Sequence, residues 1–194
     1  MPGRGWRITL WAVDTLIRLG VSANAASLVG MFLGVLSGLL FYLTALNPLL
    51  FLAGAVAVFL RSAFNVFDGM IAHRTGNLTP TGTFLNDFTD RVADVFMLVG
   101  YGYAYGSSPL WGFLACVGAL LTAAVRLAGK VAGARMHYGG VMSKPVRMYA
   151  LILTSPIAAF VEGFPVARYV LIAITIGTLV TVLQRAWWVL RDLS

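Results

Sequence analysis

The sequence predicts an all-α integral membrane protein, with six transmembrane helices preceded by an interfacial amphipathic helix. Hydrophobic residues make up 59% of the 194 positions and charged residues only 11%, a balance that favours a membrane protein over a soluble domain. Apolar stretches of about 20 residues, the length that a helix needs to cross a bilayer, recur along the chain. We therefore expect one membrane domain over residues 1–194.

Residues 1–22 are predicted to form the interfacial helix. Arg7, Asp14 and Arg18 are interspersed with Trp and Leu residues, so the segment lacks the continuous apolar core of a cleavable signal peptide. A helix with one charged and one apolar face lies on the membrane surface instead of crossing it.

Residues 23–194 are predicted to form the six-helix bundle. Each expected span is close to the length of a membrane helix, with ends uncertain by about four residues. The spans are 25–45, 49–72, 84–105, 110–133, 146–162 and 165–186.

The charges predict which ends of the spans face the cytoplasm. The connections at 47–48, 106–109 and 162–163 contain no Lys or Arg, whereas most basic residues lie at the opposite ends. By the positive-inside rule those opposite ends, together with both termini, are cytoplasmic. The net charge of +7 thus belongs to span ends, so we expect membrane lipids and phosphorylated substrates as partners and no nucleic acid.

Acidic residues are concentrated in one region at membrane depth. Four of the seven, Asp68, Asp87, Asp90 and Asp94, fall within residues 68–94. Carboxylates inside a membrane are expensive and usually functional. This region is therefore the predicted site.

Two helical faces carry these polar groups. One face of the second span combines Asn65 and Asp68 with the small residues Gly69 and Ala72; the third span presents Gly82, Asn86, Asp90 and Asp94 at steps of four. Facing oxygen ligands of this kind suit Mg²⁺ or Mn²⁺. The alternative is that the polar side chains only join helices by hydrogen bonds, but packing does not require four carboxylates beside one cytoplasmic opening. Arg61 shares the face of Asn65 and Asp68 and is expected to pair with the carboxylates.

The spacing of these residues resembles the signature of the CDP-alcohol phosphotransferase family, D-x2-D-G-x2-A-R-x8-9-G-x3-D-x3-D. The matching positions are Asn65, Asp68, Gly69, Ala72, His73, Gly82, Asn86 and Asp90. Three identities differ from the signature, because Asn65 and Asn86 replace Asp and His73 replaces Arg. A second register, with Asp90 and Asp94 as the final pair, would place Asn86 at the Gly position and break the interval from Ala72.

The resemblance implies roles for these residues. Asn65, Asp68, Asn86, Asp90 and Asp94 become candidate metal ligands and Asp90 the catalytic base; Asp68, Gly69, Ala72, His73 and Gly82 become candidate nucleotide-binding residues. The family resemblance implies a centre with two metal ions. An amide oxygen ligates a metal without contributing charge, so the two Asn residues leave two alternatives. Either one metal ion is bound in place of two, or Asp87 or Asp94 supplies a missing carboxylate. The two Asn residues are also similar to a bacterial subgroup of the family, which would make them a matched adaptation.

Basic residues further along the chain are candidates for binding phosphate. Arg126 and Lys130 lie one turn apart near the end of the fourth span, and Lys144 and Arg147 begin the fifth. Such cations bind a diphosphate or an acceptor's phosphate. The alternative is that they only set topology and bind anionic headgroups.

The resemblance implies transfer of a phosphatidyl or similar phospho-alcohol group from a CDP-alcohol, with CDP-diacylglycerol expected, to an acceptor hydroxyl with release of CMP. It implies phospholipid biosynthesis in a bacterial inner membrane, a cytoplasmic active site and a homodimer. An ion-coupled transporter is one alternative, since intramembrane Asp also binds ions; a catalytically inactive scaffold is another. No residue identifies the acceptor.

Overall fold

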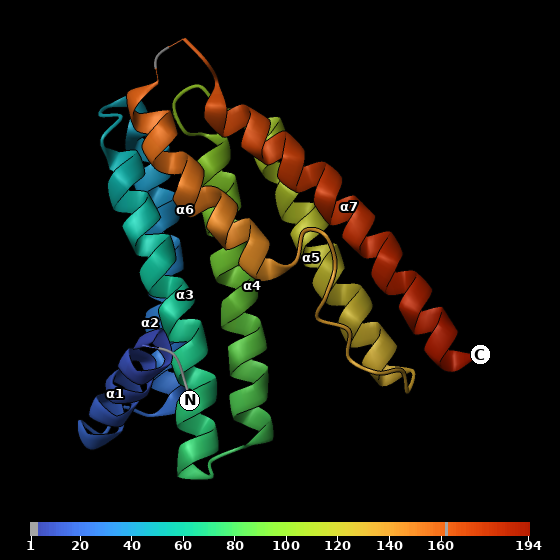
Figure 1. Ribbon diagram of the computed structural model, residues 1–194. Coiled ribbons are helices and arrows are strands. Elements are labelled where there is room, and N and C mark those ends of the chain that lie inside the picture. Colours follow the sequence, from blue (N-terminus) through green and yellow to red (C-terminus); the bar gives the residue numbers. More distant parts are fainter. Residues whose placement is uncertain (1–3, 162) are drawn as a thin grey trace.

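The structure, a computed structural model, describes residues 4–161 and 163–194 as seven α-helices and one short 3₁₀ turn, without strands in these ranges (Figure 1). The elements are α1 (Arg4–Arg18), α2 (Ala23–Tyr42), η1 (Leu43–Ala45), α3 (Leu50–Thr75), α4 (Pro80–Gly102), α5 (Pro109–Val131), α6 (Lys144–Phe160) and α7 (Val166–Leu193). The predicted all-α class is confirmed. The predicted fifth span ended at Glu162, which lies outside the described residues.

Four of the described helices are long and apolar enough to cross a membrane: α2 with η1, α3, α5 and α7. The chain is therefore a multi-pass membrane protein. The other two predicted spans are helices of a different character. Asp87, Asp90, Arg91 and Asp94 lie on α4, and α6 has only 17 residues.

Local capping sets helix starts that hydropathy alone misplaces. The Thr79 hydroxyl accepts a hydrogen bond from the Gly82 backbone N–H at 3.0 Å, and Pro80 occupies the first turn. Both features are typical of a helix N-terminus. As a result α4 begins at Pro80, whereas the predicted span began at residue 84.

Glycines bring α2 against α4. A Cβ on Gly34 would lie 2.5 Å from the Ala93 Cβ, and one on Gly38 would lie 2.2 Å from the Phe96 carbonyl oxygen. Only residues without a side chain permit such an approach, as in other membrane helix pairs. Since α2 also packs on α3, these three helices form one side of the bundle, and the pair α5 and α7 forms the other (Figure 1).

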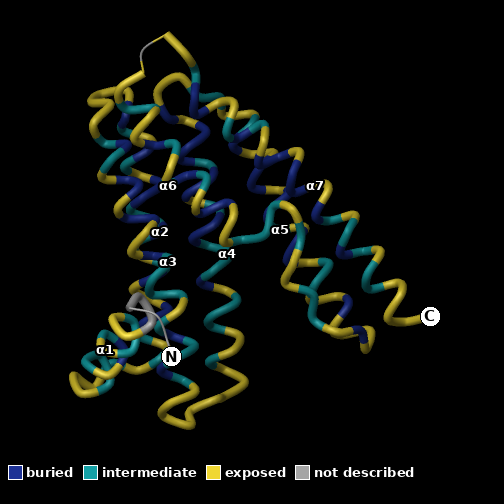
Figure 2. The backbone as a smooth tube through the Cα atoms, viewed as in Figure 1, coloured by how far each residue is buried: buried dark blue, intermediate teal, exposed yellow. Residues whose placement is uncertain are grey.

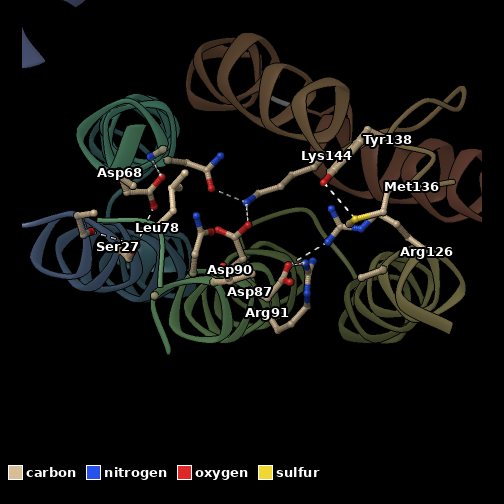
Figure 3. A pocket seen from close by; sticks show the side chains of 18 of the residues that line it. Ser27, Asp68, Leu78, Asp87, Asp90, Arg91, Arg126, Met136, Tyr138 and Lys144 are labelled. Atoms are coloured by element: carbon tan, nitrogen blue, oxygen red, sulfur yellow. Dashed lines mark hydrogen bonds and ion pairs between the residues drawn. The ribbon is translucent and has the colours of Figure 1, made fainter. Parts of the chain in front are cut away.

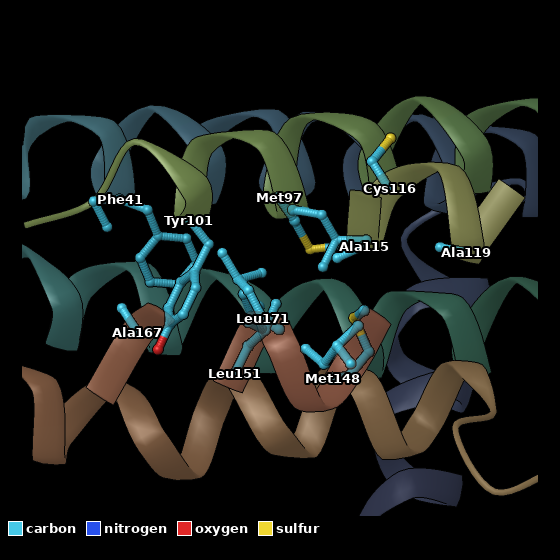
Figure 4. Close-up of a cluster of buried hydrophobic side chains, with 14 of the residues drawn as sticks. Phe41, Met97, Tyr101, Ala115, Cys116, Ala119, Met148, Leu151, Ala167 and Leu171 are labelled. Atoms are coloured by element: carbon cyan, nitrogen blue, oxygen red, sulfur yellow. The ribbon is translucent and has the colours of Figure 1, made fainter. Parts of the chain in front are cut away.

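The apolar core lies where the helices converge. Phe41, Met97, Tyr101, Leu151 and Leu171 come from the four helices α2, α4, α6 and α7 and are fully buried (Figure 4). Figure 2 shows that burial falls away toward the turn between α3 and α4, where the chain is exposed. The polar site lies between this exposed end and the core.

Helix α1 lies across the end of the bundle near the turn between α3 and α4 (Figure 1). Val13 packs with Ala26 and Ile71, and Asp14 forms an ion pair with Arg74 at the end of α3. Ile8, Trp11 and Leu19 remain exposed. The helix therefore has one face on the protein and apolar side chains directed away from it.

Candidate active site

A cavity of about 550 Å³ brings most of the predicted site residues together. Side chains from α2, α3, α4, α5, α6, α7 and the connection before α6 line it. The predicted residues among them are Asn65, Asp68, Gly69, Ala72, His73, Gly82, Asn86, Asp90, Arg126, Lys130, Lys144 and Arg147. Gly69 has no atom within 4 Å of where its Cβ would be, so its missing side chain leaves open space in the cavity.

Asp68 is held on the α3 wall by two hydrogen bonds. Its Oδ2 accepts from the Ser27 hydroxyl at 2.8 Å, and its Oδ1 accepts from the Gly69 backbone N–H at 2.6 Å (Figure 3). The side chain is only 4% exposed, and a buried carboxylate needs such partners. Ser27 is a site residue that sequence reasoning missed, because it lies on α2, outside the signature.

Asp90 lies between two cations. Its Oδ1 accepts from Arg61 and its Oδ2 from Lys144, each at 2.5 Å. Arg61 therefore pairs with a carboxylate, as expected, but with Asp90 of α4 and not with Asp68 on its own helix face. Lys144 reaches from the start of α6, and its Nζ also donates to Asn65 Oδ1 at 2.9 Å (Figure 3). One ammonium thus joins α3, α4 and α6.

Asp87 belongs to a second group of charges on the other side of Asp90 (Figure 3). Its Oδ1 accepts from Arg91 at 3.2 Å and from Arg126 at 2.9 Å. The Arg126 guanidinium also lies 4.8 Å from the centre of the Tyr138 ring, a cation–π arrangement. Arg126 is therefore fixed from two sides at the cavity wall.

Asp94 is not among the residues that line the cavity. Each step of four residues rotates about 40° around a helix, so the direction changes by roughly 120° between Gly82 and Asp94. The Asp94 Oδ2 instead accepts from Arg147 at 3.2 Å, with Arg91 at 3.9 Å. Its carboxylate is occupied by arginine.

Arg185 is one of the basic residues near the predicted cytoplasmic span ends, yet it is buried and lines the cavity. It donates to the carbonyl oxygens of Thr122, Tyr138 and Gly139 at 2.7, 2.8 and 2.9 Å. Asp192 near the end of α7 accepts from the Arg135 backbone N–H at 3.0 Å. Helix α7 continues to Leu193, beyond the predicted end at 186, and Asp192 lies in this added part.

The oxygen donors suit a divalent cation in chemical type. Asp68 and Asp90 supply carboxylates, and Asn65 and Asn86 line the same cavity with amide oxygens, all ligands that Mg²⁺ and Mn²⁺ accept. The Lys144 ammonium already lies between Asn65 and Asp90, which shows that this position accepts a positive charge. Among the described residues, no three Asp, Glu, His or Cys side chains form a ready metal cluster.

A membrane bundle whose cavity combines carboxylates with converging Arg and Lys defines a membrane enzyme acting on phosphorylated substrates. The CDP-alcohol phosphatidyltransferase family model matches residues 21–188, and the chain belongs to this family. It is therefore a transferase of phospholipid biosynthesis, and the transporter alternative is not supported.

Relatives and solved structures agree with this assignment. The archaetidylinositol phosphate synthase of Pyrococcus horikoshii is 30% identical over 146 residues, 73% of this chain and 72% of the relative. The phosphatidylinositol phosphate synthase of Mycobacteroides abscessus is 28% identical, over 92% of this chain and 82% of the relative. The match to the Escherichia coli inner membrane protein YnbA, 36% identical, spans 42% of this chain and 40% of that protein.

The fold is that of a solved phosphatidylinositol phosphate synthase. The structure of the Mycobacterium tuberculosis enzyme with CDP-DAG bound has a TM-score of 0.79 at 20% identity, covering 94% of each chain. A second structure of that enzyme, in complex with manganese and citrate, has a TM-score of 0.78 at 20% identity, covering 94% of this chain and 88% of the other.

Proposed function

We propose that this protein transfers the phosphatidyl group of CDP-diacylglycerol to an acceptor hydroxyl and releases CMP. The observation that carries the proposal is the cavity in which Asp68 and Asp90 meet Arg126, Lys144 and other cations. The M. tuberculosis enzyme that shares this fold is described with CDP-DAG bound. The family signature falls on the same cavity wall.

The proposed membrane arrangement has six spans, with α1 at the interface. Helix α4 packs against α2 and α5, and α6 packs against α3 and α7, so both shorter or more polar helices have apolar neighbours. Exposed Ile8 and Trp11 on α1 suit the headgroup region. The distribution of basic residues supports a bacterial inner membrane orientation with the cavity and both termini cytoplasmic. A homodimer is part of the proposal and rests on the family resemblance.

In the proposed reaction, the acceptor oxygen attacks the phosphorus that carries diacylglycerol. An oxygen–phosphorus bond forms, the bond from that phosphorus to the CMP oxygen breaks, and the leaving CMP takes the electron pair. Asp90 accepts the proton of the acceptor hydroxyl, and Arg61 holds its carboxylate in place. Arg126, Lys130 and Lys144 are positioned to bind phosphate groups, whereas Arg147 at the cavity wall is held by Asp94.

The divalent metal would be held by Asn65, Asp68, Asn86 and Asp90. Asp94 is not included among these ligands, because its carboxylate pairs with Arg147. When bound, Mg²⁺ or Mn²⁺ would offset the diphosphate charge and that of the departing CMP. The solved manganese complex of the M. tuberculosis enzyme supports including a metal in the proposal. Asp68, Gly69, Ala72, His73 and Gly82 would contact the nucleotide.

The acceptor proposed first is a phosphorylated inositol, because several relatives are phosphatidylinositol or archaetidylinositol phosphate synthases. The cations around Arg126 suit an acceptor that carries its own phosphate. Glycerol phosphate, inositol and serine complete the panel that distinguishes these acceptors.

The test is CMP release from CDP-diacylglycerol by purified protein in liposomes. Each acceptor is supplied with Mg²⁺, Mn²⁺ or a chelator. Asp90→Asn is expected to lower the rate at least about 100-fold, the contribution of a general base, whereas Asp14→Asn, outside the cavity, serves as the matched control. CDP-diacylglycerol binding without CMP release under any condition would contradict the proposal and indicate an inactive scaffold or a different CDP-alcohol.

A further inference from the structure

The ionised side chains around the signature carboxylates already balance in charge. Asp68 and Asp90 contribute two negative charges, and Arg61 and Lys144, the cations that contact Asp90, contribute two positive charges. Asn65 and Asn86 are neutral. A divalent ion added to this group would leave two positive charges uncompensated in a low-dielectric setting, which is costly. A divalent metal is therefore expected to compete with one of these two cations for the Asp90 carboxylate.

The geometry identifies which cation competes. The Lys144 Nζ lies 2.9 Å from Asn65 Oδ1 and 2.5 Å from Asp90 Oδ2. A Mg²⁺ ion bound by the same two oxygens would lie about 2.0–2.1 Å from each. Two oxygens this close to one ammonium cannot also hold a metal between them, so the ammonium and the ion exclude each other.

Lys144 is able to move, whereas Arg61 is not. The Arg61 side chain is 3% exposed in the middle of α3, while the Lys144 side chain is 21% exposed and begins at the first residue of α6. A lysine has four rotatable side-chain bonds and a compact charge. Displaced from Asp90, its ammonium remains within the cavity that Arg126 and Lys130 also line.

We propose that Lys144 is a tethered counter-ion that competes with one divalent metal for Asn65 and Asp90, and that metal binding releases its ammonium toward the substrate phosphates. In the metal-free protein Lys144 holds α3, α4 and α6 together. In the metal-bound protein it is a phosphate-binding residue. The consequence for substrate rests on the proposed function; the competition itself does not.

The first experiment is a Mn²⁺ titration of purified protein without substrate, followed by electron paramagnetic resonance. Lys144→Met removes the charge and keeps the length, whereas Lys144→Arg keeps the charge. We expect one ion per chain, with affinity at least about tenfold higher in Lys144→Met because the competing ammonium is lost. Lys144→Arg is expected to stay near the unsubstituted protein. Equal or weaker Mn²⁺ binding by Lys144→Met would overturn the proposal.

A second measurement uses the unsubstituted chain and does not depend on how the variants fold. The chain contains two lysines, Lys130 and Lys144, so acetylation of each can be followed by mass spectrometry. Mn²⁺ is expected to increase labelling of Lys144 severalfold relative to Lys130, which is exposed in the same cavity. An unchanged ratio would overturn the displacement.

The outcomes separate this proposal from the proposed function. Stronger Mn²⁺ binding by Lys144→Met together with no CMP release by the unsubstituted protein would retain the competition and reject the transfer reaction. Metal-dependent CMP release together with unchanged Mn²⁺ affinity in Lys144→Met would retain the reaction and reject the competition.

Discussion

Asp94 of α4 and Arg147 of α6 form an ion pair of 3.2 Å in which neither side chain is more than 2% exposed. Arg147 also donates to the Met142 carbonyl oxygen at 3.0 Å. The pair therefore joins two helices and the end of the connection that precedes α6. It also fixes Arg147 at the cavity wall.

Removing both partners of this pair is expected to cost less stability than the sum of the two single removals. Asp94→Asn or Arg147→Met should each cost about 3–5 kcal/mol, because the other charge stays buried and unpaired. The double variant Asp94→Asn/Arg147→Met should cost clearly less than the sum. Denaturant unfolding in detergent micelles measures these values, and strictly additive losses would contradict the coupling.

Two glycines are expected to respond in opposite ways to the same substitution. Gly38→Ala would place a methyl group 2.2 Å from the Phe96 carbonyl oxygen, so α2 and α4 must separate, at a cost of about 1–3 kcal/mol. Gly69→Ala meets no atom within 4 Å and should leave stability equal or slightly higher, since alanine favours helix. Thermal unfolding of both variants gives the comparison; equal losses would contradict it.

Gly69→Ala is nevertheless expected to weaken binding of a CDP-alcohol. Its methyl group would extend into the cavity space that Gly69 leaves open. A clash there should reduce affinity by about 1–3 kcal/mol. Calorimetric titration with CDP-diacylglycerol in micelles measures the effect. Unchanged affinity in a folded variant would place the nucleotide elsewhere.

Ser27→Ala is expected to reduce the rate of CMP release without unfolding the protein. Asp68 would lose the hydroxyl donor that lies 2.8 Å away, and a hydrogen bond to a charged group contributes about 1.5–3 kcal/mol. Ser37→Ala is the matched control, because the Ser37 hydroxyl donates to the Gly34 carbonyl within α2. If both substitutions change the rate equally, the role of Ser27 is not specific.

Arg185→Gln is expected to loosen the connection between α5 and α6. Three carbonyl oxygens of that region would lose a charged donor, and tryptic cleavage after the exposed Arg135 should accelerate severalfold. Arg191→Gln serves as the control, since Arg191 lies over the Trp187 ring near the end of α7. Equal cleavage rates for the two variants would contradict the anchoring role.

The length of the apolar runs was sufficient to predict the helices, and the fixed spacing was sufficient to predict the polar residues that α3 and α4 contribute to the site. Asn65, Asp68, Asn86 and Asp90 follow periodicities that any straight helix preserves, so their common cavity could be expected. The pattern could not show that the Asp94 side chain lies outside the cavity. Steps of four residues rotate gradually around the helix axis, and the side chain's final environment depends on a neighbour such as Arg147 that the spacing does not reveal.

The missing residues depend on contacts between distant parts of the chain. Ser27 and Asp68 are 41 positions apart, and Arg185 and Thr122 are 63 apart. A serine in an apolar helix is explained by a hydrogen bond to its own helix backbone, and an arginine near a span end is explained by the positive-inside rule. Neither residue therefore stands out in the sequence. Only the packing of α2 on α3, and of α7 on α5, gives them a place in the site.

The residues that line the cavity come from nearly the whole length of the chain, and this affects the order in which the site is assembled during membrane insertion. Its wall extends from Ala23 in α2 to Arg185 in α7. A nascent chain whose final helix has not yet been inserted holds both signature carboxylates but lacks the arginine that secures the connection before α6. The cavity is thus expected to be complete only after synthesis of α7.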